Sequence, residues 1–523
     1  MKKILNLIYV PLLVLGLSGC EDFLSVESPD QSTSGNYWTT QEAALSGLSA
    51  AYSQLYNGGG WRFHEYGYTL EPFREDMISM GPGASGYGYM TSIFNFTYNA
   101  SSSLPAYLWN YNYWGLSYSN QVIDKVGAMD PAVFEQGMQE RIIAEARFMR
   151  GYYHMKLLLN WEKIVVREKY ITSEADIDKA LSPRDYAWDF IVKDFKYAAS
   201  KLPMTRGTSD KGRATSAAAN AYLGYALLTR SYEETARRDE FLTAAAEALK
   251  PENFVGYSLV PMNQWLGMFN GTNENSSESI FEIQFSPVTS GNAYYKHQMH
   301  YWVASEELGG WEGILPSDGL VKEFKKEGKV STLGGYDSRM YSTLFFQDDY
   351  FNDDNGKVMG ENYDYWFCEW KKGTDGKYYP DLTTAYNKPV FRKFIPIDAS
   401  AMVPDETAMN IMLMRYANVM LMRAEVLNEQ NHPELAKPII NELRARANMP
   451  GMKGSSQAEV RAQIEHERIV EFALENYRFY DLRRWGKVKS ALEAVSRTGF
   501  DPSRHNFLFT PQGEIDSNGQ IKK

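Results

Sequence analysis

The sequence predicts a mostly α-helical protein in which helix pairs form a scaffold for an irregular, loop-rich face with few short strands. Two observations support this prediction. Apolar residues recur at spacings of three and four in several long segments, which is the period of a helix buried on one side. Two other long stretches, 57–103 and 251–404, are rich in glycine and aromatic residues and show no clear helical period.

Caps, breakers and apolar stripes place the helices along the chain. Thr39 or Thr40 can cap the first helix, and three consecutive glycines end it. The expected helices cover 41–56, 105–129, 131–160, 183–201, 215–230, 414–424 and 434–447. Alanines on the buried face of 215–230 allow close helix packing, which is typical of tetratricopeptide-type helix pairs, although no strict repeat period is present.

The 523 residues are enough for a large core, and we expect a single domain over 37–523. The helical scaffold is expected at about 37–56, 104–250 and 405–495, and the loop-rich ligand face at about 57–103 and 251–404. A rigid helical scaffold that presents long loops is a common division of labour, so the loops are the expected working face.

The N-terminus predicts export and lipid attachment. Lys2 and Lys3 precede an apolar run that is too short to span a bilayer, so 1–19 is interpreted as a signal peptide. The run ends in Leu-Ser-Gly-Cys, which resembles a bacterial lipobox, and cleavage there leaves Cys20 to carry lipid. The alternative is an ordinary signal peptide with Cys20 a chance residue. Residues 20–36 are polar and are expected to be a tether.

Charge and cysteine content exclude several classes of protein. The formal net charge is −11 and no basic cluster stands out, so nucleic acid is not an expected partner. Only two cysteines are present, and with Cys20 lipidated, Cys368 has no intramolecular partner. Disulfide frameworks and cysteine zinc sites are thereby excluded. No segment after the signal peptide is a transmembrane candidate.

Residues 467–486, ERIVEFALENYRFYDLRRWG, begin as an amphipathic helix with Ile469, Phe472 and Ala473 on one face. Asn476 tolerates a left-handed conformation, so the helix is expected to bend or end there. The ion pairs expected from helical spacing are Arg468 with Glu471, Glu475 with Arg478, and Asp481 with Arg484.

Three glutamates on one stripe of this helix, Glu467, Glu471 and Glu475, raise acid/base catalysis as an alternative to a structural role. A catalytic pair needs environments that separate two pKa values, whereas every carboxylate in this stretch has an arginine within four residues. We therefore interpret the stretch as an ion-paired helix packed against the body of the protein.

The same stretch resembles the C-terminal signature of the SusD/RagB family of nutrient-binding outer-membrane lipoproteins, roughly R-x-x-E-x-x-x-E-G-x-R-x-x-D-L-x-R-W. The matching residues are Arg468, Glu471, Glu475, Arg478, Asp481, Leu482, Arg484 and Trp485. Asn476 replaces the usual glycine, and both residues tolerate positive φ. The segments EARFMRGYYHMKLLLNW and MRYANVMLMRAEVLNE and the ending FTPQGEIDSNGQ also resemble this family, whereas the likeness is loose over about 250–400.

The resemblance implies a SusD-like fold and a cell-surface lipoprotein, held by its lipid on the outer face of an outer membrane. It further implies a protein that captures a glycan, is not an enzyme, and sits on a TonB-dependent SusC-like transporter. Two alternatives stay open: a peptide-binding member of the same family, or a surface glycan hydrolase.

Gly81 to Gly86 match the pattern G-x-G-x-x-G of phosphate-cradling loops. Pro82 lies inside the pattern and the following residues do not start a helix, so the context that such a loop needs is missing. We expect a flexible loop here and no nucleotide cofactor.

Two polar clusters could suggest a metal. One consists of His297, His300, Glu306 and Glu307, and its spacing fits no zinc pattern, so surface or loop histidines are favoured. The other, four aspartates within 348–354, fails the pattern of a calcium loop and is interpreted as a solvated acidic loop. We expect neither a metal nor a cofactor.

Aromatic residues carry the positive argument for function. They make up 14% of the chain, with 36 Tyr and 12 Trp, which is enough to supply surface platforms as well as core. Trp and Tyr stack on the apolar faces of sugars while Arg, Asn and Asp bond the hydroxyls. In the family that the chain resembles, ligand sites often use residues from loops in the two loop-rich stretches, 57–103 and 251–404. The candidate ligand-binding residues are Tyr87, Tyr89, Tyr295, Tyr301, Trp302 and Trp311, with Arg74 and Asn292 as polar partners.

Overall fold

The computed structural model describes residues 37–287, 295–331, 334–354, 356–402 and 406–521. Cys20, the tether and the candidate Asn292 lie outside these ranges. Among the described residues, no helix combines the length and the apolar character that a membrane span requires.

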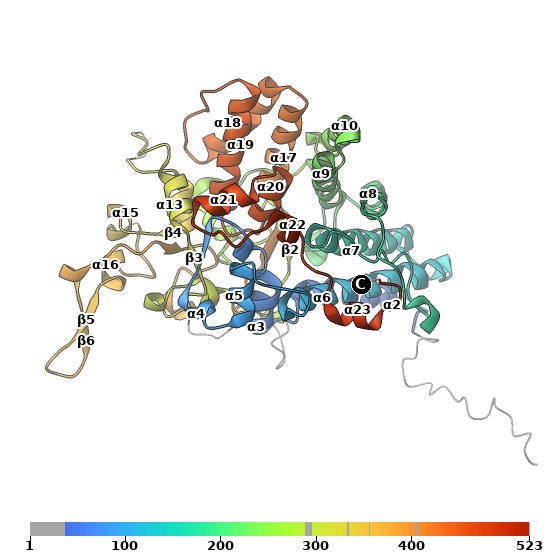
Figure 1. Ribbon diagram of the computed structural model, residues 1–523, viewed down its shortest axis with the longest axis horizontal. Helices are drawn as coiled ribbons and strands as arrows, with labels where there is room; N and C mark the ends of the chain where they lie inside the picture. The colour runs from blue at the N-terminus through green and yellow to red at the C-terminus, as the bar shows by residue number, and fades with distance from the viewer. Residues whose placement is uncertain (1–36, 288–294, 332–333, 355, 403–405, 522–523) are drawn as a thin grey trace, which may run out of the picture.

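A row of long helices forms the N-terminal half of the scaffold. It contains α2 (Gln41–Ser53), α6 (Ser103–Gly127), α7 (Met138–Asn160), α8 (Arg184–Lys201), α9 (Ser216–Glu233) and α10 (Arg238–Ala248). Each helix from α6 to α10 packs on the next one along the chain, so the row is built from neighbouring helix pairs (Figure 1). The predicted cap is present, because the Thr40 side chain accepts a hydrogen bond from the backbone N–H of Ala43.

The C-terminal helices follow, and the first three of them continue this row. They are α17 (Tyr416–Glu429), α18 (Pro433–Arg446), α19 (Gln457–Phe472), α20 (Arg478–Arg484), α21 (Val488–Ala494), α22 (Pro502–His505) and α23 (Gln512–Ser517). Because α17 packs on α9, α10, α18 and α19, the first and last thirds of the chain share one helical layer. Ser456 and Glu459 form a reciprocal capping box at the start of α19.

The remaining segments form the loop-rich half, seen on the left in Figure 1. Its short helices are α3 (Gly60–Arg62), the π-helical turn η3 (Phe63–Tyr68), η4 (Pro72–Arg74), α4 (Pro82–Ser85), α5 (Gly88–Phe94), α11 (Met262–Trp265), α12 (Met299–Val303), α13 (Asp318–Lys325), α14 (Ser338–Thr343), α15 (Asp349–Asn352) and α16 (Tyr363–Trp366). Local turns therefore dominate a half in which the sequence predicted loops with short strands.

All named strands of the described residues pair in twos, and every pair is antiparallel. The pairs are β1 (Ile78–Met80) with β3 (Ile314–Pro316), β2 (Ser279–Ile283) with β8 (Ile411–Arg415), β4 (Leu344–Phe345) with β7 (Val390–Phe391), and β5 (Glu369–Lys372) with β6 (Tyr378–Asp381). The last pair is a hairpin that projects from the body in Figure 1. The predicted fold class, mostly α with few short strands, is confirmed.

Two helix assignments needed correction. The helix predicted over 131–160 begins at Met138, because a separate turn covers 131–133 and Gly137 adopts a φ of +74° that interrupts the helix. The helix α10 was not predicted as an element of its own. Both differences concern helix starts, which depend on single residues more than on the apolar period.

The signature stretch ends its first helix at Phe472 and resumes at Arg478, with Asn476 at a φ of +64°. The prediction that the helix ends near Asn476 is therefore confirmed. Of the three predicted ion pairs, only Asp481 with Arg484 is present. The observed partners are Asp481 for Arg468, Asp76 for Arg478, and Arg415 and Lys393 for Glu475. The other two predicted pairs were wrong, because the chain turns between the helices and directs these side chains to other elements.

Glu471 is the centre of a buried ion-pair network. It is fully buried, and its carboxylate lies 2.8 Å from Arg415, 2.5 Å from Arg446 and 3.2 Å from Arg339. The indole N–H of Trp265 adds a hydrogen bond at 3.3 Å. Burial acts to raise the pKa of Glu471, but the three guanidinium groups outweigh it and hold that pKa well below its usual range. The carboxylate is therefore a structural anion that joins β8, α14, α18 and α19.

Replacing Glu471 by Gln is expected to lower the free energy of unfolding by about 3–5 kcal/mol, because three buried arginines lose their shared counter-charge. Urea denaturation followed by circular dichroism measures this. Glu493→Gln is the control, since Glu493 forms only an exposed pair with Lys489 at 3.9 Å and its loss should leave the midpoint unchanged. Equal midpoints for the wild type and Glu471→Gln would contradict the structural role of the network.

His154, a buried histidine on α7, is expected to make the folded protein less stable in acid. His154 Nε2 accepts a hydrogen bond from the backbone N–H of Arg167 at 3.1 Å, and burial, reinforced by Arg150, lowers the pKa of His154 to about 3. Because this value is below the unfolded value of about 6.5, the stability contributed by neutral His154 is complete above pH 6.5 and is lost as the pH falls towards 3. His154→Gln should therefore lose less stability than the wild type between pH 6.5 and 4.5 in urea titrations. If the free energy of unfolding falls equally with pH in the wild type and in His154→Gln, the folded protein does not lower the pKa of His154.

Candidate functional site

The two loop-rich stretches meet where β1 pairs with β3. Directly after β1, the backbone N–H of Gly81 donates to the carbonyl of Gly313 at 3.1 Å, and that of Gly83 to the carbonyl of Glu312 at 3.3 Å. A Cβ atom on Gly83 would lie 1.9 Å from the carbonyl oxygen of Trp311. The glycines of the G-x-G-x-x-G pattern therefore permit close approach of the Trp311 loop. The segment forms the helical turn α4 and not the expected flexible loop.

Trp311 presents an aromatic platform at this junction. Its side chain is 41% exposed and stacks on Tyr301, with ring centroids 5.3 Å apart and planes at 21°. The buried imidazole of His64 supports it, with centroids 5.6 Å apart. The backbone N–H of Trp311 donates to the carbonyl of Tyr301 at 2.7 Å, so the pair is fixed by main chain as well as by stacking.

Polar groups that can bond hydroxyls are connected to the platform through Glu312, the residue that follows Trp311. Lys388 Nζ lies 2.6 Å from the Glu312 carboxylate and 2.8 Å from that of Glu307, and the Tyr386 hydroxyl donates to Glu307 at 2.9 Å. Burial acts to raise the pKa of Glu307, but the hydrogen bond from Lys388 outweighs it and holds the pKa below its usual value. The site thus combines an apolar face with a polar group of one ammonium and two carboxylates.

Three other candidates are at the surface. Tyr87 is 46% exposed and contacts Tyr89, with centroids 5.7 Å apart. The Tyr89 hydroxyl donates to Glu65 Oε2 at 2.6 Å. Tyr295 is exposed and meets Tyr56 edge-on at 5.3 Å. Tyr87 and Tyr89 follow the Gly81–Ser85 turn, so main chain connects them to the Trp311 platform.

Trp302 and Arg74 are buried, at 2% and 0% exposure. Trp302 lies on α12 against Gly313, where an added Cβ would come within 2.5 Å of the indole ring. Arg74 donates to Asn160 Oδ1 at 2.5 Å and stacks over the Phe479 ring at 4.2 Å. Neither side chain offers a face to solvent in this structure, because long-range contacts that the sequence does not reveal cover both.

The prediction of surface histidines at 297 and 300 was wrong, since both are fully buried. His297 Nε2 lies 2.8 Å from the carbonyl of Met409, and its Nδ1 accepts from the backbone N–H of Met299 at 3.0 Å. Burial lowers the pKa of His297 to about 3, so it is neutral at physiological pH. We interpret His297 as a packing residue beneath the loop-rich face.

Within the described residues, three potential metal ligands converge at Glu327, His466 and Glu467. Arg444 lies 2.7 Å from Glu327 and 2.6 Å from Glu467, so these carboxylates already have a cationic partner. Burial acts to lower the pKa of His466, but hydrogen bonds to Glu323 and Glu327 raise it to about 9. A protonated imidazole cannot ligate a cation, so the cluster is an ion-pair network.

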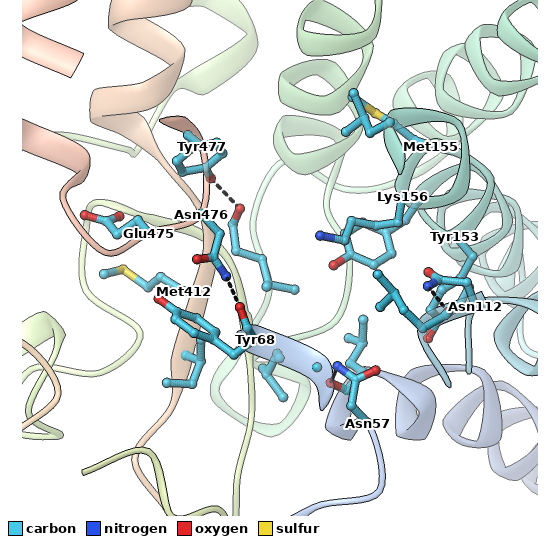
Figure 2. A pocket seen from close by; sticks show the side chains of 18 of the residues that line it. Asn57, Tyr68, Asn112, Tyr153, Met155, Lys156, Met412, Glu475, Asn476 and Tyr477 are labelled. Atoms are coloured by element: carbon cyan, nitrogen blue, oxygen red, sulfur yellow. Dashed lines mark hydrogen bonds between the residues drawn. The ribbon is translucent and has the colours of Figure 1, made fainter. Parts of the chain in front are cut away.

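An interior cavity of about 110 Å³ lies between the helical scaffold and the loop-rich half. Figure 2 shows Asn476 and Tyr477 on one side of it and Lys156 of α7 on the other. Asn476 donates to the Tyr68 carbonyl at 3.4 Å, and the Tyr477 hydroxyl to the Leu413 carbonyl at 2.6 Å. This space lies between packed side chains, whereas the Trp311 ring is exposed, so the exposed aromatic surface is the better candidate site.

The sequence analysis missed aromatic residues that contact this surface. Trp61 and Tyr66 lie on α3 and η3, with ring centroids 5.5 Å apart. Tyr107, Tyr111 and Trp114 lie on α6 at spacings of four and three, which places them on one helical face. This spacing was the available signal, but it shows only that the three residues share a face and not which face is exposed.

Two family models match the chain. One, described as the SusD family, matches residues 277–519, and the other, described as starch-binding associating with outer membrane, matches residues 22–228. The chain belongs to the SusD-like family. The family resemblance predicted from the signature stretch is thus confirmed, and the two matches together cover most of the chain.

Relatives and solved structures agree over nearly the whole SusD-like chain. It is 24% identical to SusD-like protein P2 of Formosa agariphila over 97% of both chains. A SusD superfamily protein from Bacteroides vulgatus is similar with a TM-score of 0.76 and 24% identity, over 93% of this chain and 99% of that one. Surface glycan-binding protein A from Bacteroides thetaiotaomicron, solved in complex with laminarihexaose, matches with a TM-score of 0.70 and 18% identity, over 92% and 98%.

Replacing Gly83 by Ala is expected to displace the Trp311 loop, because the new methyl group would overlap the Trp311 carbonyl. Hydrogen exchange of peptides covering 301–316 should become faster, since the amides of this loop would lose their fixed main-chain partners. Gly86→Ala is the matched control within the same motif, because nothing lies within 4 Å of its added Cβ. Unchanged exchange in Gly83→Ala would show that the glycine does not position the loop.

Proposed function

We propose that this SusD-like protein binds a glycan on the aromatic surface around Trp311 and delivers it to a TonB-dependent SusC-like transporter. The observation that carries the proposal is the exposed Trp311–Tyr301 stack, held in place by the glycine turn and followed in the chain by Glu312, which pairs with Lys388. A platform that is already ordered loses little conformational freedom when a ligand stacks on it.

The chemistry of the surface fits a sugar better than a charged or fully apolar ligand. The indole face of Trp311 can cover the C–H face of a sugar ring, and the neighbouring ammonium and carboxylate groups can exchange hydrogen bonds with hydroxyl groups. Of the similar solved structures, one is named a laminarin-binding SusD-like protein and another was solved with laminarihexaose. These names support a glycan as the ligand class.

Family membership supports the proposed transporter partnership, and the lipobox-like sequence that ends at Cys20 supports the proposed membrane location. A lipid anchor at the outer face of the outer membrane would hold the binding surface at the entrance of a transporter and raise the local ligand concentration. We propose a binding role without catalysis, because the carboxylates of the signature stretch are held by arginines: Glu471 by Arg415, and Glu467 by Arg444.

Replacing Trp311 by Ala is expected to weaken glycan binding by at least about tenfold, equivalent to ~1.4 kcal/mol, because the stacking face is removed. The measurement is calorimetric titration of the soluble chain beginning after Cys20. The ligands are laminari- and malto-oligosaccharides, with a peptide panel beside them. Trp370→Ala is the control, since Trp370 is similarly exposed but lies on the projecting β5–β6 hairpin.

Other outcomes of this titration have defined meanings. If peptides bind and none of the sugars does, the ligand of this protein is a peptide and not a glycan. Steady release of new reducing ends from a polysaccharide would overturn the binding-only role. Purification of the lipidated protein from its native membrane without an outer-membrane partner would contradict delivery to a transporter.

A further inference from the structure

A continuous row of aromatic rings leads from the proposed glycan surface onto the helical scaffold. We call it the aromatic ladder, and in spatial order it consists of Tyr87, Tyr89, Tyr66, Tyr107, Tyr111 and Trp114. Successive ring centroids are 5.7, 5.7, 4.5, 4.4 and 4.8 Å apart. The ladder therefore joins α5, which follows the Gly81–Ser85 turn, to the exposed side of α6.

Main-chain contacts hold the middle of the ladder. The Tyr107 hydroxyl donates to the carbonyl of Asn57 at 3.0 Å. Gly58 has a φ of +82°, and an added Cβ would lie 2.6 Å from the hydroxyl of Tyr111 and 2.9 Å from that of Tyr107. Only a residue without a side chain fits between these hydroxyls and the turn after α2. The rings are thus built into the fold and are not loosely attached surface groups.

The ladder ends at an open groove beside Trp114. The groove has a volume of about 180 Å³, and its polar lining includes Asn110, Ser117, Arg167, Lys169 and Glu514. Trp114 is 50% exposed and forms one wall. Over the ranges that the structure describes, no ion pair is formed by Lys169. A half-exposed indole beside amide, hydroxyl and ammonium groups repeats the chemistry of the Trp311 surface.

We propose that this groove is a second glycan subsite and that the ligand is an extended chain, which stacks on Trp311 at one end and on Trp114 at the other. The inference rests on the proposed glycan-binding function and adds the size of the ligand to it. The ladder favours one chain over two separate ligands, because it runs from Trp114 to Tyr87, and the turn at Gly83 that precedes Tyr87 contacts the main chain of Trp311. Two linked contacts also strengthen binding more than either contact alone.

The test compares short and long ligands on four proteins: the wild type, Trp114→Ala, Trp311→Ala and the control Trp370→Ala. The ligands are laminaribiose, laminarihexaose and laminarin, with maltose, maltohexaose and amylopectin as the second series, all measured by calorimetry or affinity electrophoresis. We expect Trp114→Ala to weaken binding of the hexaose and the polysaccharide of the recognised series about tenfold, and to leave the disaccharide unchanged. Trp311→Ala should weaken all three. Asn110→Ala should reproduce the selective effect in smaller measure, since it removes one hydrogen-bonding group from the groove.

The outcomes separate this inference from the function on which it rests. If Trp311→Ala weakens binding and Trp114→Ala matches the wild type on every ligand, the second subsite is overturned and the glycan surface stands. If Trp114→Ala instead loses an outer-membrane partner during copurification with glycan affinity intact, the groove is a protein interface and the subsite is likewise overturned. If the wild type binds neither series, both proposals fail for these glycans.

Discussion

The buried network around Glu471 is the constraint on which the two halves of the molecule depend. Its arginines come from α14 in the loop-rich half and from β8 and α18, while the carboxylate comes from α19. Removing an ion from water costs several kcal/mol unless it is paired and hydrogen-bonded. None of these elements can therefore bury its charge alone, so they fold against one another or not at all.

That constraint explains how a half made of short turns and two-stranded sheets remains ordered. An isolated pair of short strands is marginal in water, and β1 with β3 spans only three residues on each side. The pair is stable because the segment before β1 and the helix α13 after β3 are joined to the helical layer, through Asp76 with Arg478 and through Glu323 with His466. Because β3 follows Trp311 closely in the chain, these ion pairs also hold the segment that carries Trp311.

The sequence was informative where structure is local and failed where contacts are distant. The cap at Thr40 and the break at Asn476 were readable because caps and left-handed residues act within one turn. The partners of Glu471 were not readable, since Arg415 and Arg339 lie 56 and 132 positions away. Helical spacing offered nearer partners, and tertiary structure overrode them.

The same limit applies to the candidate site. Composition singled out aromatic residues in two loop-rich stretches, but Trp302 and Trp311 are nine positions apart and only one of them is exposed. Their difference arises because Gly313 packs on the Trp302 ring while the Trp311 ring turns outward onto Tyr301. Neither contact has a period or a motif that a single sequence displays, so exposure had to come from the structure.

The aromatic ladder finally shows that scaffold and working face are not separate parts of this protein. Tyr107, Tyr111 and Trp114 belong to α6, whose opposite side packs on α7 in the core. Rings on such a helix cannot shift without moving the core, whereas Tyr87 caps the short helix α5 and Tyr89 lies on it. The surface therefore has a rigid end at Trp114, and its geometry towards a ligand is set by helix packing as much as by the loops.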